Sequence, residues 1–179
     1  MRAKRWVRVL SRETGYTPLT AAVLSARGID TPQAAADYLS CDVRGLHDPF
    51  GLTDMDKAVE VIRDVIDRGE KMVVYGDYDV DGITGATLIL QTLRFHDVPS
   101  TVHLPDRRKE GYGLNIPEIE RLAAEEGPGI LLTVDCGISD VKAVERAREL
   151  GFMVVVSDHH MPPEELPPAH AITNPRLSE

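Results

Sequence analysis

From about residue 70 onward, short apolar runs alternate with segments of helical periodicity. The runs are MVVY at 72–75, STVHL at 100–104, GILLTV at 129–134 and FMVVV at 152–156, and the helical segments lie near 84–96, 116–126 and 139–150. Strands separated by helices in this way form βαβ units, whose strands pair in parallel and are covered by helices on both faces. We therefore predict an α/β fold with a parallel sheet and helices on both of its faces.

The first fifty residues have a different pattern, which is helical. Two Thr-Pro pairs, Thr17-Pro18 and Thr31-Pro32, precede LTAAVLSARG and QAAADYL. Thr is a good N-cap and Pro suits the first helical position, so each pair predicts a helix start. A further amphipathic helix is predicted at 53–68, where apolar residues recur every three or four positions. The expected organisation is an N-terminal helical region at 1–52 followed by an α/β domain at 53–179.

Composition narrows the class of protein. The 179 residues carry a net charge of −9, which disfavours a surface that binds nucleic acid through clustered Lys and Arg. A polyanionic substrate would therefore require cations bound locally. No apolar run approaches the ~18 residues of a membrane span, and the start at Met1 leads into no signal peptide. Cys41 and Cys136 form neither a disulfide framework nor a C-x-x-C motif, so we predict a small buried hydrophobe at each and a cytoplasmic location.

Acidic residues and histidines stand where the predicted strands end. They are Asp77, Asp79 and Asp81 after the first run, Asp135 after the third, and Asp158, His159 and His160 after the fourth. The carboxyl ends of parallel strands lie along one edge of a sheet, and ligands bind at that edge in such folds. We therefore expect these side chains to converge in space.

Several kinds of site share the spelling GDYDVDG at 76–82, and the surroundings discriminate among them. An EF-hand loop would need Glu where Leu88 stands, and a dinucleotide-binding turn would need G-x-G-x-x-G. An aspartyl-phosphatase motif resembles VDGIT but leaves His159 and His160 without a role. A solvated Asp-rich turn explains the first cluster taken alone. Crowded carboxylates at several strand ends nevertheless require a compensating charge, and a metal cluster supplies it.

Three motifs and several flanking segments resemble the DHH phosphoesterase family. The motifs are VVYGDYDVDGITG, LLTVDCGIS and VVVSDHHMPP, the last of which contains the Asp-His-His that gives the family its name. LHDPFGLTDMDKAV at 46–59, LPDRRKEGYGLN at 104–115 and ITNPR at 172–176 are similar to the RecJ exonucleases, which are specific for single-stranded DNA. The resemblance covers nearly the whole chain and implies that residues 53–179 form a DHH phosphoesterase domain.

The resemblance implies a site with two divalent metal ions, Mn²⁺ or Mg²⁺. The implied residues are Asp77, Asp79, Asp81, Asp135 and His159 at the metals, Asp158 and His160 in catalysis, and Arg107 and Tyr112 at the substrate. Asp135 would bridge the metals, while Asp77 would be a direct ligand or an outer partner. His160 would stabilise the charge developing on the phosphate, and Asp158 would orient the histidines.

The segment DRRKEGYGLN, at 106–115, allows two interpretations. A charged solvated loop followed by a Gly-Tyr-Gly turn explains it without any ligand. In the interpretation that the family implies, Arg107 contacts a phosphate and Tyr112 stacks on a base, a contact that tolerates any base sequence. The sequence alone leaves both interpretations open.

The activity that the resemblance implies is 5′ to 3′ hydrolysis of single-stranded DNA in repair and recombination, with single-stranded DNA as partner. A pair of cations would activate water and hold the attacking and leaving oxygens in line. Two alternatives remain: a DHH hydrolase of short oligonucleotides, cyclic dinucleotides or pyrophosphate, and a non-catalytic DHH scaffold. The family's fourth motif and second domain are absent from the sequence, so we expect a fragment with little activity alone. The sequence identifies no protein partner.

Overall fold

The computed structural model describes residues 15–40 and 42–178. The chain divides into two compact units, one ending at Asp48 and the other starting at Pro49, and each is described by itself. Among the described residues, no helix is both long enough and apolar enough to cross a membrane.

The first unit contains the two helices that the Thr-Pro pairs predict, α1 (Pro18–Ser25) and α2 (Pro32–Leu39). The hydroxyl of Thr17 accepts a hydrogen bond from the amide of Thr20 at 3.4 Å, and that of Thr31 accepts one from the amide of Ala34 at 3.1 Å. Both threonines therefore act as N-caps. A single-turn 3₁₀-helix, η1 (Val43–Gly45), follows. The predicted buried cysteine at position 41 lies outside the described residues.

The second unit is built on a five-stranded parallel sheet with the strand order β2-β1-β3-β4-β5. Its strands are β1 (Met72–Gly76), β2 (Ser100–His103), β3 (Ile130–Val134), β4 (Met153–Ser157) and β5 (Ala171–Thr173), and its helices are η2 (Pro49–Gly51), α3 (Met55–Asp67), α4 (Val80–Phe95), α5 (Ile116–Glu126) and α6 (Val141–Glu149). The predicted parallel α/β fold is confirmed. The short edge strand β5 was not predicted.

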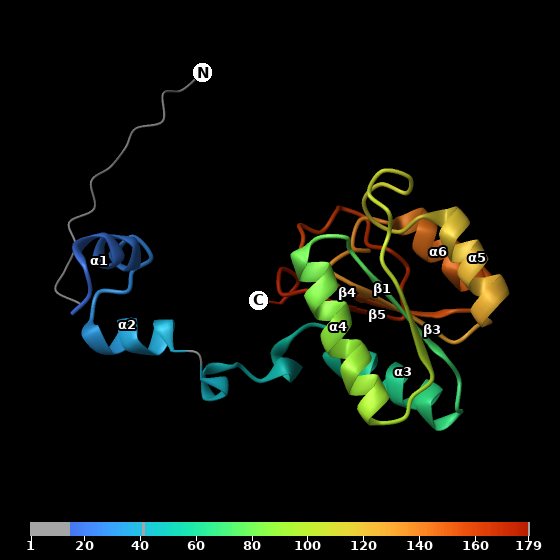
Figure 1. Ribbon diagram of the computed structural model, residues 1–179, viewed down its shortest axis with the longest axis horizontal. Helices are drawn as coiled ribbons and strands as arrows, with labels where there is room; N and C mark the ends of the chain where they lie inside the picture. Colours follow the sequence, from blue (N-terminus) through green and yellow to red (C-terminus); the bar gives the residue numbers. More distant parts are fainter. Residues whose placement is uncertain (1–14, 41, 179) are drawn as a thin grey trace, which may run out of the picture. The chain divides into compact units, whose positions relative to one another are not determined.

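Helices cover both faces of this sheet, as predicted (Figure 1). On one face α5 and α6 pack against alternate residues of the central strands, and the core includes Ile119, Val144 and Phe152. On the other face α3 and α4 enclose a core that includes Val65, Ala86 and Leu93. β1 and β3 are buried along their whole length, because each has a neighbour on both sides and a helix layer above and below.

Helix α4 begins at Val80, although the sequence predicted its start near residue 84. Asp79 is its N-cap and accepts hydrogen bonds from the amides of Asp81 and Gly82 at 2.8 and 3.1 Å. The first turn contains β-branched residues and a glycine, which have low helix propensity, and this composition conceals the start. The helix therefore extends into the Asp-rich segment, and Asp81 lies in its first turn.

Candidate metal centre at the carboxyl edge of the sheet

Two aspartates follow β1 and are held in different ways. Asp77 continues the strand: its amide donates to the carbonyl of Val134 at 3.1 Å, and its side chain is buried with Oδ1 lacking any hydrogen-bond partner. Asp79 is exposed but fixed by its capping bonds. Burial raises the pKa of Asp77, whereas the backbone amide of Gly82 lowers the pKa of Asp79. Asp79 therefore provides the more readily ionised carboxylate of the pair.

Gly82 makes the tight approach of β1 and α4 possible. A Cβ atom at this position would lie 2.3 Å from the carbonyl oxygen of Asp77 and 2.5 Å from its amide nitrogen. Real side chains do not tolerate such distances to backbone atoms, so only glycine fits without moving the turn. The glycine thereby brings Asp77 and Asp79 to adjacent positions at the end of β1.

Asp135, directly after β3, occupies an unusual environment. Its backbone has φ +63°, a left-handed conformation that costs free energy for a residue with a side chain. Its amide donates to the carbonyl of Ser157 at 2.9 Å, which ties this turn to the end of β4. Both carboxylate oxygens are buried and neither has a hydrogen bond of regular geometry, although Nε2 of His159 lies at ion-pair distance from Oδ1. Burial, together with the nearby Asp79, raises the pKa of Asp135 to about 6.

Asp158 organises the two histidines that follow it. Its Oδ1 accepts hydrogen bonds from the amides of His159 and His160 at 2.7 and 3.0 Å, and lies 2.7 Å from Nδ1 of the His160 ring. Its Oδ2 accepts from the amide of Ile138 at 3.0 Å. The buried carboxylate therefore fixes the backbone of both histidines, and its hydrogen bond raises the pKa of His160.

Of the three groups of potential ligand atoms among the described residues, one is His103, Glu110 and Glu118, and the other two share Asp135. One of these two contains Asp135, His159 and His160 and the other contains Asp77, Asp79 and Asp135, and within each group the atoms lie within 4.8 Å of one another. Nε2 of His159 lies 2.9 Å from Oδ1 of Asp135. Carboxylate oxygens without hydrogen bonds suit hard divalent cations such as Mn²⁺ and Mg²⁺, with imidazole nitrogen as a further donor. The residues present therefore fit divalent metal ions, which these carboxylates and imidazoles would hold.

Asp81 is the one predicted metal residue that lies outside both groups. It is exposed in the first turn of α4, and its amide donates to Asp79 Oδ1. Its predicted part in metal binding stays a prediction.

Asn174 and Arg176, to which the sequence assigned no role, donate hydrogen bonds to the backbone carbonyls of the two histidines. The side chain of Asn174, fully buried, donates to the carbonyl of His160 at 3.0 Å and accepts from the amide of Arg176 at 2.9 Å. Nε of Arg176 donates to the carbonyl of His159 at 2.8 Å. The segment ITNPR was the available signal, and the structure shows that it holds the backbone of the His-His pair.

The two predicted substrate residues lie in the loop between β2 and α5 and reach residues of the site. The hydroxyl of Tyr112 lies 3.2 Å from Nδ1 of His160. The guanidinium carbon of Arg107 lies 5.3 Å from the ring centroid of Tyr78, which stands between the two aspartates that follow β1. Figure 1 shows this loop projecting beyond the carboxyl end of β2. The loop therefore places one cationic and one aromatic side chain beside the candidate metal centre.

The chain is similar in sequence to proteins of known activity. Residues 71–179 match the family model described as the DHH family, N-terminal domain. The single-stranded-DNA-specific exonuclease RecJ of Bacillus subtilis (strain 168) is 39% identical over 170 residues, which are 95% of this chain and 22% of that protein. RecJ of Escherichia coli (strain K12) is 37% identical over 163 residues, 90% of this chain and 27% of the relative. The chain thus spans about a quarter of the length of these relatives.

Solved structures match the same fold. The crystal structure of exonuclease RecJ bound to manganese matches with a TM-score of 0.68 at 28% identity, over 74% of this chain and 34% of the other. RecJ from Thermus thermophilus in complex with Mn²⁺ matches with a TM-score of 0.70 at 24% identity, over 99% of this chain and 26% of the other.

Proposed function

Because the chain belongs to the DHH family, we propose that it forms the metal-binding part of a single-stranded-DNA-specific exonuclease that hydrolyses DNA from its 5′ end. The observation that carries the proposal is the environment of Asp135, whose two buried oxygens accept no hydrogen bond and lie among two further aspartates and two histidines. Such a cluster calls for cations, and two RecJ structures of this fold contain manganese.

The proposed metal ligands are Asp77, Asp79, Asp81, Asp135 and His159, with Asp135 between the two ions. Bound divalent cations supply activation of water at neutral pH and neutralisation of the charge on phosphate. The protein itself contributes placement. Asp79 is fixed by its capping bonds and Asp135 by its backbone bond to Ser157, so both carboxylates keep their positions without a ligand.

His160 is proposed to act on the substrate phosphate. Its Nδ1 faces Asp158 Oδ1 at 2.7 Å, which leaves Nε2 as the nitrogen free to donate to a phosphate oxygen. This hydrogen bond to Asp158 is the first cause of the raised pKa of His160. A cationic donor next to the scissile phosphate stabilises the negative charge that develops there.

The substrate is proposed to be held by the loop that carries Arg107 and Tyr112. The guanidinium would pair with a phosphate and the phenol ring would stack on a base, so neither contact depends on base sequence. We assign the catalytic part to residues 53–179 and an N-terminal helical region to 1–52, and we place the protein in the cytoplasm, where it would act on DNA during repair and recombination.

The test uses the intact protein and substrates that separate the alternatives. With Mn²⁺ present, single-stranded DNA labelled at its 5′ end should be degraded to mononucleotides, and chelation of the metal should abolish the reaction. Duplex DNA, a cyclic dinucleotide and pyrophosphate should be cleaved far more slowly. Cleavage confined to the small substrates would replace the proposal with a small-phosphoester hydrolase. If Mn²⁺ binds and no substrate is cleaved, the domain is a non-catalytic scaffold.

A further inference from the structure

The ring of His103, at the end of β2, lies between two glutamates from different parts of the chain. Nε2 lies 2.9 Å from Oε2 of Glu110 in the following loop, and Nδ1 lies 2.9 Å from Oε1 of Glu118 in α5. The three side chains are only 14%, 20% and 15% exposed. The ring also contacts Tyr75 of β1, with a centroid separation of 4.8 Å. His103 thus joins β2, the loop and α5 at one point.

The two glutamates beside His103 have their partners within the protein. Arg121 forms a second ion pair with Glu118. His103 therefore contacts both glutamates and Arg121 contacts one of them, and the group is connected by contacts within the protein.

Glu110 uses its other oxygen to close the loop. Oε1 accepts a hydrogen bond from the amide of Asp106 at 2.7 Å, while the amide of Glu110 donates to the carbonyl of Asp106 at 2.9 Å. Gly111 and Gly113 then adopt φ +83° and +82°, on the two sides of Tyr112. The side chain that His103 holds is therefore also the one that shapes the turn leading to Tyr112.

We propose that His103, Glu110 and Glu118 are positioning residues that hold the loop of residues 104–115 so that Arg107 and Tyr112 meet the substrate. The proposal rests on the proposed function, since it concerns how single-stranded DNA is held. In the described contacts none of the three reaches an aspartate or histidine of the candidate metal centre, so they act through the loop. A partly buried, charge-assisted network reduces the freedom that the loop would otherwise lose on binding DNA.

The test compares Glu110→Gln and His103→Asn with a matched control, Glu125→Gln, in the intact protein. Glu125 also lies in α5 and pairs with Arg121, but makes no ion pair with His103. Both loop variants should lower kcat/KM on single-stranded DNA on the order of tenfold, mainly through KM. The control should change it less than about twofold, as is usual for an exposed ion pair. The double variant should be no worse than the poorer single variant, because the two residues form one unit.

Three further measurements separate positioning from a general loss of structure. Cleavage of bis(p-nitrophenyl) phosphate, which lacks the bases and further phosphates that Arg107 and Tyr112 are proposed to contact, and calorimetric Mn²⁺ affinity should both change far less than kcat/KM on single-stranded DNA. Amide hydrogen exchange should quicken within residues 104–115 and not in β1 or β3. Unchanged kcat/KM on single-stranded DNA in both loop variants would overturn the inference, as would equal losses on both substrates. A wild-type protein that cleaves neither substrate would instead overturn the proposed function.

Discussion

Several buried polar atoms lack hydrogen-bond partners at the carboxyl edge of the parallel sheet, whereas polar groups at its amino edge have them. At the carboxyl edge, Asp77 Oδ1 and both carboxylate oxygens of Asp135 are buried without hydrogen bonds, and Asp135 has a left-handed backbone. Each of these features lowers the stability of the metal-free fold.

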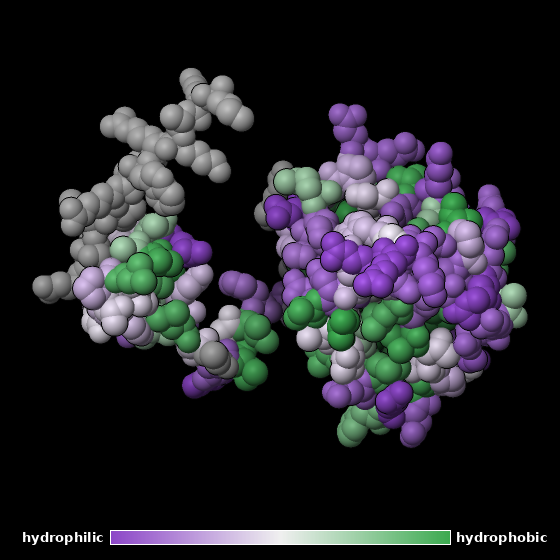
Figure 2. Space-filling view, turned by 45° about the horizontal axis from the view of Figure 1, so that its top comes forward, coloured by the Kyte–Doolittle hydropathy of each residue, from purple (hydrophilic) through white to green (hydrophobic). Residues whose placement is uncertain are grey.

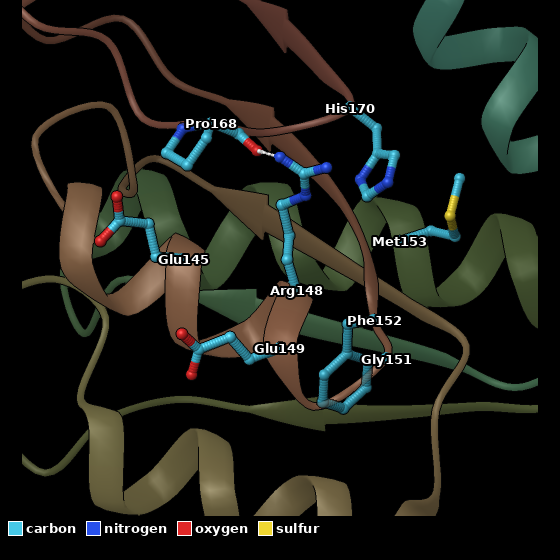
Figure 3. A pocket seen from close by; sticks show the side chains of 8 residues that line it. All are labelled: Glu145, Arg148, Glu149, Gly151, Phe152, Met153, Pro168 and His170. Carbon is cyan, nitrogen blue, oxygen red and sulfur yellow. Dashed lines mark hydrogen bonds between the residues drawn. The ribbon is translucent and has the colours of Figure 1, made fainter.

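At the amino edge, charged side chains lie at the surface and polar groups have hydrogen-bond partners. A surface pocket of about 730 Å³ lies there (Figure 3), lined by Glu145, Arg148, Glu149, Gly151, Phe152, Met153, Pro168 and His170. Arg148 donates to the carbonyl of Pro168 at 2.8 Å, and Nδ1 of His170 accepts from the amide of Val154 at 2.9 Å. The first bond links the connection between β4 and β5 to α6, and the second links it to β4.

The two edges belong to one sheet and share its strands, so the difference lies in the residues after and before each strand. At the carboxyl edge, buried carboxylates lack hydrogen-bond partners, and a bound cation would compensate their charge. At the amino edge, Arg148 and His170 have hydrogen-bond partners within the chain. The surface of the second unit also combines hydrophilic and hydrophobic regions. The side of the second unit seen in Figure 2 is largely hydrophilic around a hydrophobic patch, and α4 exposes Val80, Leu88 and Phe95 by 72%, 67% and 82%.

The largest expected effect is on catalysis when Asp135 is changed. In the intact protein, Asp135→Ala should lower hydrolysis of single-stranded DNA by about a thousandfold or more, because both proposed metals lose a shared ligand. Binding of single-stranded DNA should remain detectable in a gel-shift assay. Near-normal turnover by this variant would show that the carboxyl edge is not the metal centre.

The carboxylate of Asp135 should destabilise the folded protein when no metal is bound. Asp135→Asn removes the charge while keeping the shape, so the metal-free variant should melt at a higher temperature than the metal-free wild type. Thermal unfolding followed by circular dichroism in the presence of a chelator measures this. A lower melting temperature for the variant would contradict the contrast between the two edges.

A smaller effect is expected from adding metal to the chain of residues 1–179. Mn²⁺ at a hundred times its dissociation constant should stabilise the fold by about 2.7 kcal/mol and raise the melting temperature by roughly 5–10 °C. Because only about a quarter of the relatives' length is present, hydrolysis of single-stranded DNA by this chain should be very slow. Robust exonuclease activity from residues 1–179 would contradict this, and an unchanged melting temperature would count against the metal site.

The sequence allowed the architecture to be predicted because its strands are buried, apolar and separated by helices. It also indicated which residues would meet, since Asp77, Asp79, Asp135, His159 and His160 all follow strands that end at one edge. β5 escaped prediction because AIT is only three residues long and pairs with β4 alone. A run of this length has no periodicity to detect.

Two features of the site depend on tertiary contacts that no local pattern encodes. The left-handed backbone of Asp135 occurs where its amide donates to the carbonyl of Ser157, on the neighbouring strand. Asn174 reaches the carbonyl of His160 only because β5 lies beside β4. Roles of this kind follow from strand order, which the alternation of strands and helices does not specify.

A pair of glycines allows the two edges to be compared directly. A Cβ at Gly82, on the carboxyl edge, would lie 2.3 Å from the carbonyl oxygen of Asp77, and a Cβ at Gly129, on the amino edge, would lie 2.1 Å from the carbonyl oxygen of Lys71. Gly82→Ala and Gly129→Ala should each destabilise the fold by about 1–3 kcal/mol, measured by urea unfolding. Only Gly82→Ala should also weaken Mn²⁺ binding in calorimetry, because it displaces the turn between Asp77 and Asp79. If Gly82→Ala and Gly129→Ala bind Mn²⁺ with equal affinity, that turn does not contribute to the metal centre.

The smallest expected effect concerns His170, on the amino edge. Its Nδ1 accepts a hydrogen bond from the amide of Val154, so the folded state favours an unprotonated ring nitrogen there. Burial, and then the nearby Arg148, lowers the pKa of His170 below its ordinary value. The unfolded chain therefore binds this proton more readily than the folded chain. The contribution of His170 to stability is complete above the ordinary histidine pKa of about 6.5 and is lost as the pH falls below it.

His170→Gln tests this contribution, because the glutamine side-chain oxygen can still accept from the amide of Val154 but does not titrate. Urea unfolding of wild type and variant between pH 5 and pH 8 gives the difference in free energy of unfolding at each pH. Residues of the carboxyl edge titrate in the same range, but they are common to both proteins and cancel in that difference. The wild type should lose stability relative to the variant as the pH falls from 7 to 5. Parallel curves would mean that the amino edge does not discriminate between the two charge states of His170, and a wild type that gains relative stability on acidification would reverse the sign argued from its burial.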